Sequence, residues 1–394
     1  MIVAKTVEAH ATITGDTDIK TSSPAPNDNY FVHVDEGLNK EKSVRFDPTW
    51  LPQWLWSQEK ANEASLPESL PVPDFVQVFH LAEDCTTKAA TLQQLGSSAR
   101  DIVNACFTMS AYSPTIRRTE AVLFRNLSSK IQNAKDFAEF WKGCLAGPST
   151  NDAEKWNPVS YVPFGNQRTT LEGVDLVTNF PSKLAMVCHN EMNYNPQPAG
   201  RIAFYCLEAA PVGGETILAR NADHSRQVSQ EIQDMVNKHG GILYKRQYYD
   251  KRNPNKDSQK RFHTSWQEKT GTEDPNEAIH FFESIGFSVP DQVHFEAYED
   301  GFQKLIVENV ESGFNTQGDW FNILNVGGFP LADGTWIPKS MIQQLVLDEW
   351  KSVHVLKLCP GDWIVLNNKT VQHGRLPYQN SDDQIRTILT VYTD

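Results

Sequence analysis

The chain has 394 residues and a formal net charge of −13 at pH 7, from 36 Lys and Arg against 49 Asp and Glu. That balance argues against a nucleic-acid-binding protein, since such proteins displace phosphate counterions with cationic side chains, and equally against docking on anionic membranes. Apolar residues make up 39% and aromatic residues 10%, enough for a real core, so a disordered scaffold is excluded. The length fits one large domain or two of ordinary size.

Cysteine usage and the absence of long apolar runs predict a cytoplasmic protein. The six cysteines are widely spaced and include no Cys-x-x-Cys pair, which leaves a disulfide framework, a thiolate zinc site and a thioredoxin-like motif without support. The first residues turn acidic and polar before an apolar signal-peptide region can form, and no run of ~18 apolar residues indicates a membrane span. A homo-oligomer is neither specified nor excluded.

In the first third of the chain, the sequence predicts an irregular N-terminal segment followed by one strand and one helix. A Ser/Pro/Asn-rich stretch ends near residue 30, and alternating apolar positions predict a strand within 44–56. Apolar residues at helical spacing predict a helix over 87–110 that is interrupted near Gly96. We expect residues 1–110 to form an N-terminal extension that packs on the following domain.

From residue 121 onward, strands dominate and helices stand between them. The predicted strands cover 121–127, 184–192, 201–209, 242–249, 362–368 and 385–393, and the predicted helices cover 134–145, 222–238, 275–286 and 339–352. This order fits a β-sandwich or barrel decorated with helices better than alternating β-α-β units. No glycine-rich nucleotide-binding motif occurs. Residues 111–394 are therefore predicted to form one mainly β domain with a helical insertion at about 222–310.

Three His-x-Asp/Glu triplets are candidate metal-binding pairs, and they begin at His33, His189 and His294. Side chains two residues apart on a strand face the same side, so a triplet can supply two ligands of the two-His, one-carboxylate set that holds non-haem Fe(II). Eleven His in a chain with 49 acidic residues would give about one such match by chance. Context favours His189 and Glu191, which follow a continuous apolar run and precede another predicted strand.

A third ligand is expected from a distant strand, and His373 is the candidate because it stands where the predicted strand 362–368 emerges toward a loop. A loop histidine with a purely structural role explains it equally well. Arg386, 13 positions later, is costly to bury unless it meets a carboxylate. A dicarboxylate such as 2-oxoglutarate would meet that need, with Thr216 donating a hydroxyl to the same group. A structural salt bridge is the alternative.

Several segments of the chain resemble one oxygenase family. The segment that begins HNEMNYNPQPAGRIAFYC and ends GGETILAR resembles the iron-binding core of the taurine dioxygenase-like (TauD/TfdA-type) Fe(II)/2-oxoglutarate-dependent oxygenases, particularly the branch that includes clavaminate synthase. The segment PGDWIVLNNKTVQHGR and the strand after it are similar to that family's distal-histidine and arginine region. The matching segments are 121–144, 189–220, 265–278, 319–324 and 360–392. The resemblance covers roughly residues 115–394, and residues 1–110 match poorly.

The resemblance implies a double-stranded β-helix of the jelly-roll, cupin-like type, and it implies a role for each candidate residue. His189, Glu191 and His373 would bind Fe(II), while Arg386 and Thr216 would hold the far carboxylate of 2-oxoglutarate. It also implies an Fe(II)/2-oxoglutarate-dependent dioxygenase that uses O2 to oxidise an unactivated C–H bond of a small metabolite, with succinate and CO2 as co-products.

Two departures from the family pattern narrow the chemistry. The metal carboxylate is Glu191, where many relatives use Asp. Its presence argues against halogenation, because the halogenases of the family leave that position open for chloride. Thr390 stands where the taurine-specific enzymes carry a second arginine, so a sulfonate substrate is disfavoured.

The primary substrate is predicted only as a class, a free or carrier-bound amino acid or derivative in specialised metabolism. It would be hydroxylated, desaturated or oxidatively cyclised. Asn190, Asn193 and Tyr194 flank the metal ligands and are candidates for hydrogen bonds to a polar substrate, or they merely shape the loop. Arg375 is a candidate partner for a substrate carboxylate, with a surface salt bridge as the alternative.

Two other functions stay open on the sequence alone. A non-catalytic jelly-roll protein that binds a small metabolite would use the same fold without turnover. A zinc-dependent hydrolase would use the same two His and one Glu to hold an activated water, although it gives Arg386 and Thr216 no role.

Overall fold

The structure is a computed structural model of the whole chain. It describes residues 30–34, 50, 72–82, 90–108, 118–146, 155–159, 168–192, 198–248, 250–252, 265–289, 295–297, 303–311 and 331–394. The strand predicted within 44–56, apart from Trp50, and the family-like segment 319–324 lie outside these residues, as do His294 and the acid that follows His33 by two positions.

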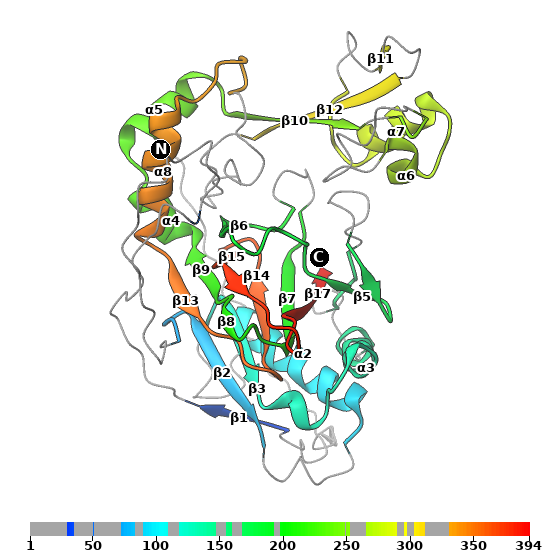
Figure 1. Cartoon of the computed structure of the whole chain (residues 1–394), viewed down its shortest axis with the longest axis vertical. Helices are drawn as coiled ribbons and strands as arrows, with labels where there is room; N and C mark the ends of the chain where they lie inside the picture. Colours follow the sequence, from blue (N-terminus) through cyan, green and yellow to red (C-terminus); the bar gives the residue numbers. More distant parts are fainter. Residues whose placement is uncertain are drawn as a thin grey trace, which may run out of the picture.

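Two sheets face each other and form the barrel (Figure 1). The large sheet contains, in spatial order, β1 (Phe31–Val34), β2 (Val76–Leu81), β3 (Ala121–Arg125), β14 (Trp363–Asn367), β7 (Arg201–Glu208), β17 (Thr387–Thr393), β5 (Val174–Leu176) and β4 (Thr170–Leu171). The small sheet contains β13 (His354–Leu356), β9 (Thr216–Arg220), β15 (Val371–Arg375) and β6 (Met186–His189). A ribbon of β8 (Val212–Gly213) and β16 (Tyr378–Gln379) joins them at one end. The predicted fold class, a mainly β double-stranded β-helix with helical insertions, is confirmed.

Alternate residues of the central strands face opposite sides of the large sheet. In β14, Trp363 and Val365 lie on the outer face of the large sheet, which two helices cover. Ile364 and Leu366 pack between the two sheets. Strand β7 divides its residues in the same way. Because both faces are buried, these strands are continuous apolar runs rather than alternating ones.

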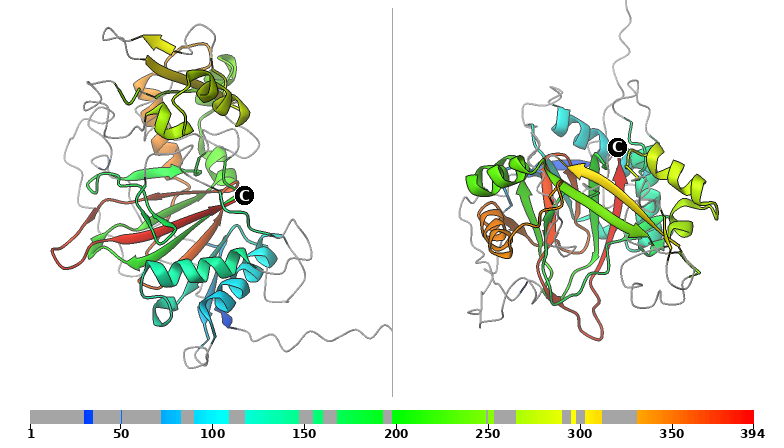
Figure 2. Two further views of the ribbon diagram at one scale, coloured as in Figure 1. Left: turned by 90° about the vertical axis from the view of Figure 1, so that its right-hand side faces the viewer. Right: turned by 90° about the horizontal axis from the view of Figure 1, so that it is seen from above.

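Helices α2 (Leu92–Thr108) and α3 (Ala134–Leu145) cover the outer face of the large sheet (Figure 2). The predicted interruption near Gly96 is wrong, because α2 runs through that residue without a break. A Cβ atom at Gly96 would stand 2.0 Å from the carbonyl oxygen of Phe140 in α3, and Gly143 of α3 meets the backbone of α2 just as closely. Glycine at position 96 allows the backbones of the two helices to come into contact.

Replacing Gly96 by alanine is expected to destabilise the fold by about 1–3 kcal/mol, because the added methyl group would force the two helices apart. Alanine's higher helix propensity offsets only about 1 kcal/mol of this. Urea unfolding measures the change. Ser98→Ala, at a half-buried position in the same helix, is the matched control and should stay within about 0.5 kcal/mol of wild type. A Gly96→Ala variant as stable as wild type would contradict the close approach.

Between β9 and β13 the chain leaves the barrel and forms helices and a three-stranded sheet with the order β10-β12-β11 (Figure 1). Its elements are α4 (Asn221–Gln227), α5 (Gln230–Lys238), β10 (Ile242–Tyr248), α6 (Trp266–Thr270), α7 (Pro275–Ser284), β11 (Phe295–Ala297), β12 (Gln303–Glu311) and α8 (Lys339–Trp350). The single helix predicted over 222–238 is two helices, because the chain becomes extended at Val228 and Ser229. Val228 thereby enters the core of this region, which has Trp266 and Phe282 at its centre.

Strands β1 and β2 and helix α2 belong to the barrel's sheet and core, although they precede residue 111. Strand β2 pairs in parallel with β3 from Val76 opposite Ala121 to His80 opposite Arg125. A short 3-10 helix, η2 (Leu127–Ser129), follows β3. The boundary at residue 110 stays a prediction, and the described part of the preceding region is built into the large sheet.

Two sequence-based expectations concern cysteines and membrane spans. The five cysteines that the structure describes are all free thiols, four of them buried and Cys359 exposed. Within the described ranges, no helix is both long and apolar enough to cross a membrane.

Candidate metal centre and its cavity

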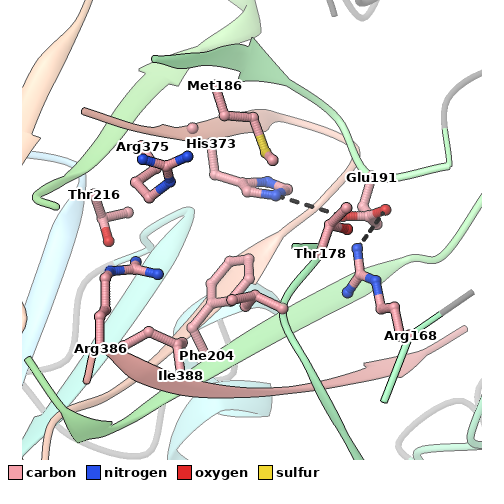
Figure 3. A pocket seen from close by; sticks show the side chains of 12 residues that line it. Arg168, Thr178, Met186, Glu191, Phe204, Thr216, His373, Arg375, Arg386 and Ile388 are labelled. Carbon is pink, nitrogen blue, oxygen red and sulfur yellow. Dashed lines mark hydrogen bonds and ion pairs between the residues drawn. The ribbon is translucent and has the colours of Figure 1, made fainter. Parts of the chain in front are cut away.

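Three buried side chains from the small sheet converge inside the barrel. His189 ends β6, Glu191 follows it by two residues, and His373 lies on the neighbouring strand β15 directly opposite His189. One ligand atom of each residue lies within 4.8 Å of the other two. Nε2 of His373 lies 3.6 Å from Oε2 of Glu191 (Figure 3), and the centroids of the two imidazole rings are 4.5 Å apart. The three residues predicted as metal ligands are thus brought together.

Strand β15 can hold His373 in this place because the next residue is glycine. Strand β15 lies between β6 and β9, and its register with β6 shifts between His373 and Arg375. A Cβ atom at Gly374 would stand 2.3 Å from the carbonyl oxygen of Met186. A side chain at Gly374 would therefore separate the two strands that carry the histidines.

A buried asparagine fixes the backbone of Glu191. The Oδ1 atom of Asn368 accepts a hydrogen bond from the N–H of Glu191 at 2.7 Å, and its Nδ2 donates to the carbonyl oxygens of Glu191 at 2.9 Å and of Ala199 at 2.7 Å. The residue after Glu191, the buried Met192, has the left-handed conformation with φ 58°. Such strained backbone persists only where neighbouring bonds hold it, so Asn368 determines where Glu191 lies.

Replacing Asn368 by aspartate should destabilise the fold by about 1–3 kcal/mol, because the carbonyl oxygens of Glu191 and Ala199 lose their buried donor. Affinity for a divalent metal should fall about tenfold, as expected when a group supporting a ligand is removed. Urea unfolding and a Co(II) titration measure the two effects. Asn367→Asp is the matched control, because Oδ1 of Asn367 only accepts, from the N–H of Lys369, and a carboxylate accepts as well. Equal stability and metal affinity in the two variants would contradict the role of Asn368.

Asn190, predicted as a substrate contact, faces the barrel backbone instead. Its Nδ2 donates to the carbonyl oxygens of Asn368 at 2.6 Å and Val371 at 3.2 Å, and the side chain does not line the cavity described below. The geometry favours a role in joining the segment of Glu191 to the hairpin before His373. The other two candidates, Asn193 and Tyr194, lie outside the described residues.

The protonation states of the histidine and the carboxylate suit a divalent metal. His189 donates from Nδ1 to the carbonyl oxygen of Val187 at 2.9 Å, which leaves Nε2 with its lone pair. Burial, and then the nearby His373, lower the pKa of His189 to about 4, so the ring is neutral at pH 7. Burial alone would raise the pKa of Glu191, but Arg168 and the two histidines lower it to about 2, so the group is a carboxylate. The neutral imidazole of His189, the carboxylate of Glu191 and the second imidazole of His373 are a donor set that fits Fe(II).

A cavity with an empty volume of about 490 Å³ lies beside these ligands (Figure 3). Its polar lining comes chiefly from Arg168, Glu191, Thr216, His373, Arg375 and Arg386. Phe204 reaches across from the large sheet, with its ring centroid 4.9 Å from that of His373. Residues of both sheets of the barrel therefore line the cavity.

Arg386 and Thr216 lie at the end of the cavity away from Glu191 (Figure 3). A Cβ atom at Gly214, which has φ +74°, would stand 3.1 Å from Cδ and Nε of Arg386, so glycine leaves the room that this side chain occupies. Among the residues that the structure describes, no carboxylate forms a salt bridge with Arg386, and the guanidinium lies over the ring of Tyr378 at 5.4 Å. Burial lowers the pKa of Arg386, yet an arginine stays charged. The structural salt bridge considered as an alternative is thus not seen in the described part of the chain.

Arg375 also lines the cavity, but its guanidinium donates hydrogen bonds to the backbone. It donates to the carbonyl oxygens of Leu376 at 3.0 Å and Pro181 at 3.2 Å and lies over the ring of Tyr378 at 4.7 Å. Burial and then Arg386 lower its pKa to about 10, so it is still charged at pH 7. These bonds tie β15 to the chain that leads into β6, and contact with a substrate stays a prediction.

Arg168 is a charged cavity residue that sequence reasoning did not single out, and Phe204, which was assigned to the core, also lines the cavity. The side chain of Arg168 is 6% exposed, and Nη2 donates to Oε1 of Glu191 at 3.3 Å. Its guanidinium lies over the ring of Tyr392 at 5.3 Å. The residue stands in the polar stretch GNQRTT, where nothing local distinguishes a buried arginine from an exposed one.

A double-stranded β-helix that brings two buried histidines and one buried carboxylate together beside a cavity has the architecture of a non-haem iron oxygenase. The family described as "Taurine catabolism dioxygenase TauD, TfdA family" matches residues 114–313, and the chain belongs to this family. The matched residues include His189, Glu191 and Thr216. They end before His373, which the fold places opposite His189. The predicted family and the enzyme class, a dioxygenase and hence an oxidoreductase, are confirmed.

Solved structures with a similar fold include two oxygenases. A taurine dioxygenase from Burkholderia xenovorans is 12% identical, with a TM-score of 0.35 over 81% of this chain and 85% of that one. An asparagine oxygenase in complex with Fe(II), 2S,3S-3-hydroxyasparagine and succinate is 10% identical, with a TM-score of 0.42 over 80% of this chain and 92% of that one. No curated protein sequence matches the chain.

Proposed function

We propose that the protein is an Fe(II)/2-oxoglutarate-dependent dioxygenase of a small metabolite. His189, Glu191 and His373 hold the Fe(II), and Arg386 with Thr216 holds the far carboxylate of 2-oxoglutarate. The observation that carries the proposal is the convergence of three buried ligand atoms, within 4.8 Å of one another, at a cavity that Glu191 and His373 line and that has a positively charged arginine at its other end. The family match supports the same reaction class.

When bound, Fe(II) with 2-oxoglutarate and O2 supplies the oxidising power that breaks an unactivated C–H bond, with succinate and CO2 as co-products. The chain's own residues bind the metal, orient the co-substrate and limit the access of water. The neutral ring of His189 and the carboxylate of Glu191 offer their lone pairs without a proton to lose, and Arg386 fixes one end of the co-substrate. Phe204, Met186 and Ile388 give the cavity apolar walls, which limit the access of water.

The primary substrate is proposed to be an amino acid or a derivative in specialised metabolism, and the protein to act in the cytoplasm. Hydroxylation, desaturation and oxidative cyclisation share this site. The mass of the product separates hydroxylation, which adds an oxygen atom, from desaturation and cyclisation, which both remove two hydrogen atoms; the NMR spectrum of the product then distinguishes a new double bond from a new ring.

The test is the anaerobic addition of Fe(II) and 2-oxoglutarate to the metal-free protein. We expect a weak visible charge-transfer band that requires both additions, followed by succinate release in air with a panel of amino acids and derivatives. A non-catalytic metabolite-binding protein would release no succinate with any compound. A zinc-dependent hydrolase would show no band and would be activated by Zn(II) alone. Absence of the band in the wild-type protein would overturn the proposal.

A further inference from the structure

The guanidinium of Arg386 is held by an aromatic ring rather than by hydrogen bonds. Its Cζ atom lies over the ring of Tyr378, 5.4 Å from the centroid. Among the residues that the structure describes, no oxygen atom accepts a hydrogen bond from this guanidinium. The face of a tyrosine ring is negative and attracts a cation within about 6 Å of its centroid. Arg386, which Figure 3 shows at the same end of the cavity as Thr216 and Arg375, is therefore fixed by a contact that uses none of its N–H donors.

Arg375 lies over the same ring but uses its donors differently. Its Cζ atom is 4.7 Å from the centroid of Tyr378, and its guanidinium also donates to the carbonyl oxygens of Leu376 and Pro181. The two arginines repel each other, because burial and then Arg386 lower the pKa of Arg375 to about 10. A ring whose negative face attracts both cations offsets part of this repulsion. Of these two arginines, Arg386 is the one whose described contacts leave its donors available for an anion.

The ring of Tyr378 is placed by the ribbon of β8 and β16, next to the strand that carries Thr216. Tyr378 of β16 pairs with Gly213 of β8. Gly214 follows with φ +74°, and a Cβ atom there would stand 3.2 Å from Cβ of Tyr378 and 3.1 Å from Cδ of Arg386. Glycine at position 214 thus lets the ring and the guanidinium pack against one stretch of backbone. Two residues later, Thr216 begins β9 and lines the cavity.

We propose that Tyr378 is a positioning residue, whose ring holds the guanidinium of Arg386 in place for the far carboxylate of 2-oxoglutarate. The inference rests on the proposed function and adds a residue that acts through Arg386. Fixing one rotamer of an arginine costs conformational entropy when a ligand binds. The ring restricts the rotamers before the co-substrate arrives, which raises affinity without a new contact to the co-substrate. The ring face rather than the hydroxyl is responsible, since no described residue forms a hydrogen bond with that hydroxyl.

The experiment changes the charge on the ring face and keeps the shape of the ring. The charge-transfer band of the full-length protein is titrated with 2-oxoglutarate at saturating Fe(II). Tyr378→Phe keeps the negative face, so the dissociation constant should stay within about twofold of wild type. Trifluorophenylalanine at position 378 has nearly the same shape without the negative face, and the dissociation constant should rise about fivefold. Gln379→Ala, at an exposed position of the same strand, is the matched control and should bind 2-oxoglutarate like wild type.

The same change in the Arg386→Gln background separates positioning from a general effect on the fold. The ring then has no cation at position 386 to hold, so trifluorophenylalanine should weaken 2-oxoglutarate binding by less than about twofold further. A merely structural effect of the fluorinated ring would persist in that background. The proposal is overturned by equal dissociation constants for the Phe and trifluorophenylalanine proteins, by a fivefold loss in Tyr378→Phe, or by the same fivefold loss without Arg386.

A further measurement tests the contact without metal or co-substrate. In the metal-free wild-type protein, labelled with ¹⁵N-arginine, the Nε–H proton of Arg386 is identified by its absence in Arg386→Gln. We expect cross-relaxation between this proton and the ring protons of Tyr378, which are identified by their change in Tyr378→Phe. Absence of this signal would overturn the proposal even if 2-oxoglutarate binds. If 2-oxoglutarate fails to bind the wild-type protein, the proposed function fails, and the cross-relaxation still decides whether Tyr378 holds Arg386.

Discussion

Replacing His373 by alanine is expected to abolish the Fe(II)-dependent charge-transfer band and all succinate release. The variant keeps only His189 and Glu191, and two ligands do not hold a divalent ion against water. Metal affinity should fall by more than ~100-fold, the upper limit seen even for groups that only support a ligand. The fold should persist, because β15 pairs with strands on both sides and the lost ring borders a cavity. An anaerobic Fe(II) titration and circular dichroism measure the two expectations.

His239→Ala is the matched control for this variant. His239 lies outside the barrel after α5, where Nδ1 contacts the carboxylate of Asp333 at 2.6 Å. Its removal takes one histidine from the chain without touching the cavity, so Fe(II) affinity and the band should not change. A band of normal intensity in His373→Ala would reject the assignment of this residue as a ligand, even with the fold intact.

Replacing Arg386 by glutamine should weaken 2-oxoglutarate binding about 30-fold, which corresponds to about 2 kcal/mol. Loss of a fully buried charge pair costs about 2–5 kcal/mol. The lower end applies because Arg386 is half-buried and solvent screens part of the interaction. Titration of the charge-transfer band with 2-oxoglutarate at saturating Fe(II) gives the dissociation constant directly.

Two measurements keep this result specific to the co-substrate. Fe(II) affinity in the absence of 2-oxoglutarate should match wild type in Arg386→Gln, because Arg386 lies away from the metal ligands. Arg226→Gln changes the net charge by the same amount at an exposed site and should leave the dissociation constant for 2-oxoglutarate unchanged. A rise of less than about threefold in Arg386→Gln would assign the far carboxylate to another residue.

The fold and the convergence of the three candidate metal ligands could be predicted because their signals are local. Continuous apolar runs mark strands such as β14 that are buried on both faces. The spacing of two residues between His189 and Glu191 singled out this pair, although β6 ends at His189 and the hydrogen bonds of Asn368, rather than the period of a strand, hold Glu191 in place. Arg386 was recognisable because an arginine at the start of a buried strand needs an anion. The family resemblance then joined His373 to the other two ligands, and the register of β15 with β6 accounts for the pairing.

The features that sequence reasoning missed depend on contacts between distant segments. Gly96 was expected to break its helix, because the sequence does not show that α3 packs against it. The break after α4 follows from the burial of Val228 in the core that contains Trp266 and Phe282. Asn190 was a candidate either for a substrate contact or for shaping the loop, and its hydrogen-bond acceptors in the hairpin before His373 favour the second role. Arg168 carried no signal at all, since its contacts with Glu191 and with Tyr392 of β17 are made between segments distant in the sequence.

Because β2 pairs in parallel with β3, the residues before position 111 protect the edge of β3 from contact with other molecules. A shortened chain of residues 111–394 would lose β1 and β2 and leave one side of β3 with unpaired backbone N–H and C=O groups. It would also uncover Phe124, which packs against Phe31 and Phe79. An open, apolar strand edge recruits strands from other molecules. Such a fragment should therefore self-associate, with light scattering rising with its concentration, while the full-length chain stays dispersed.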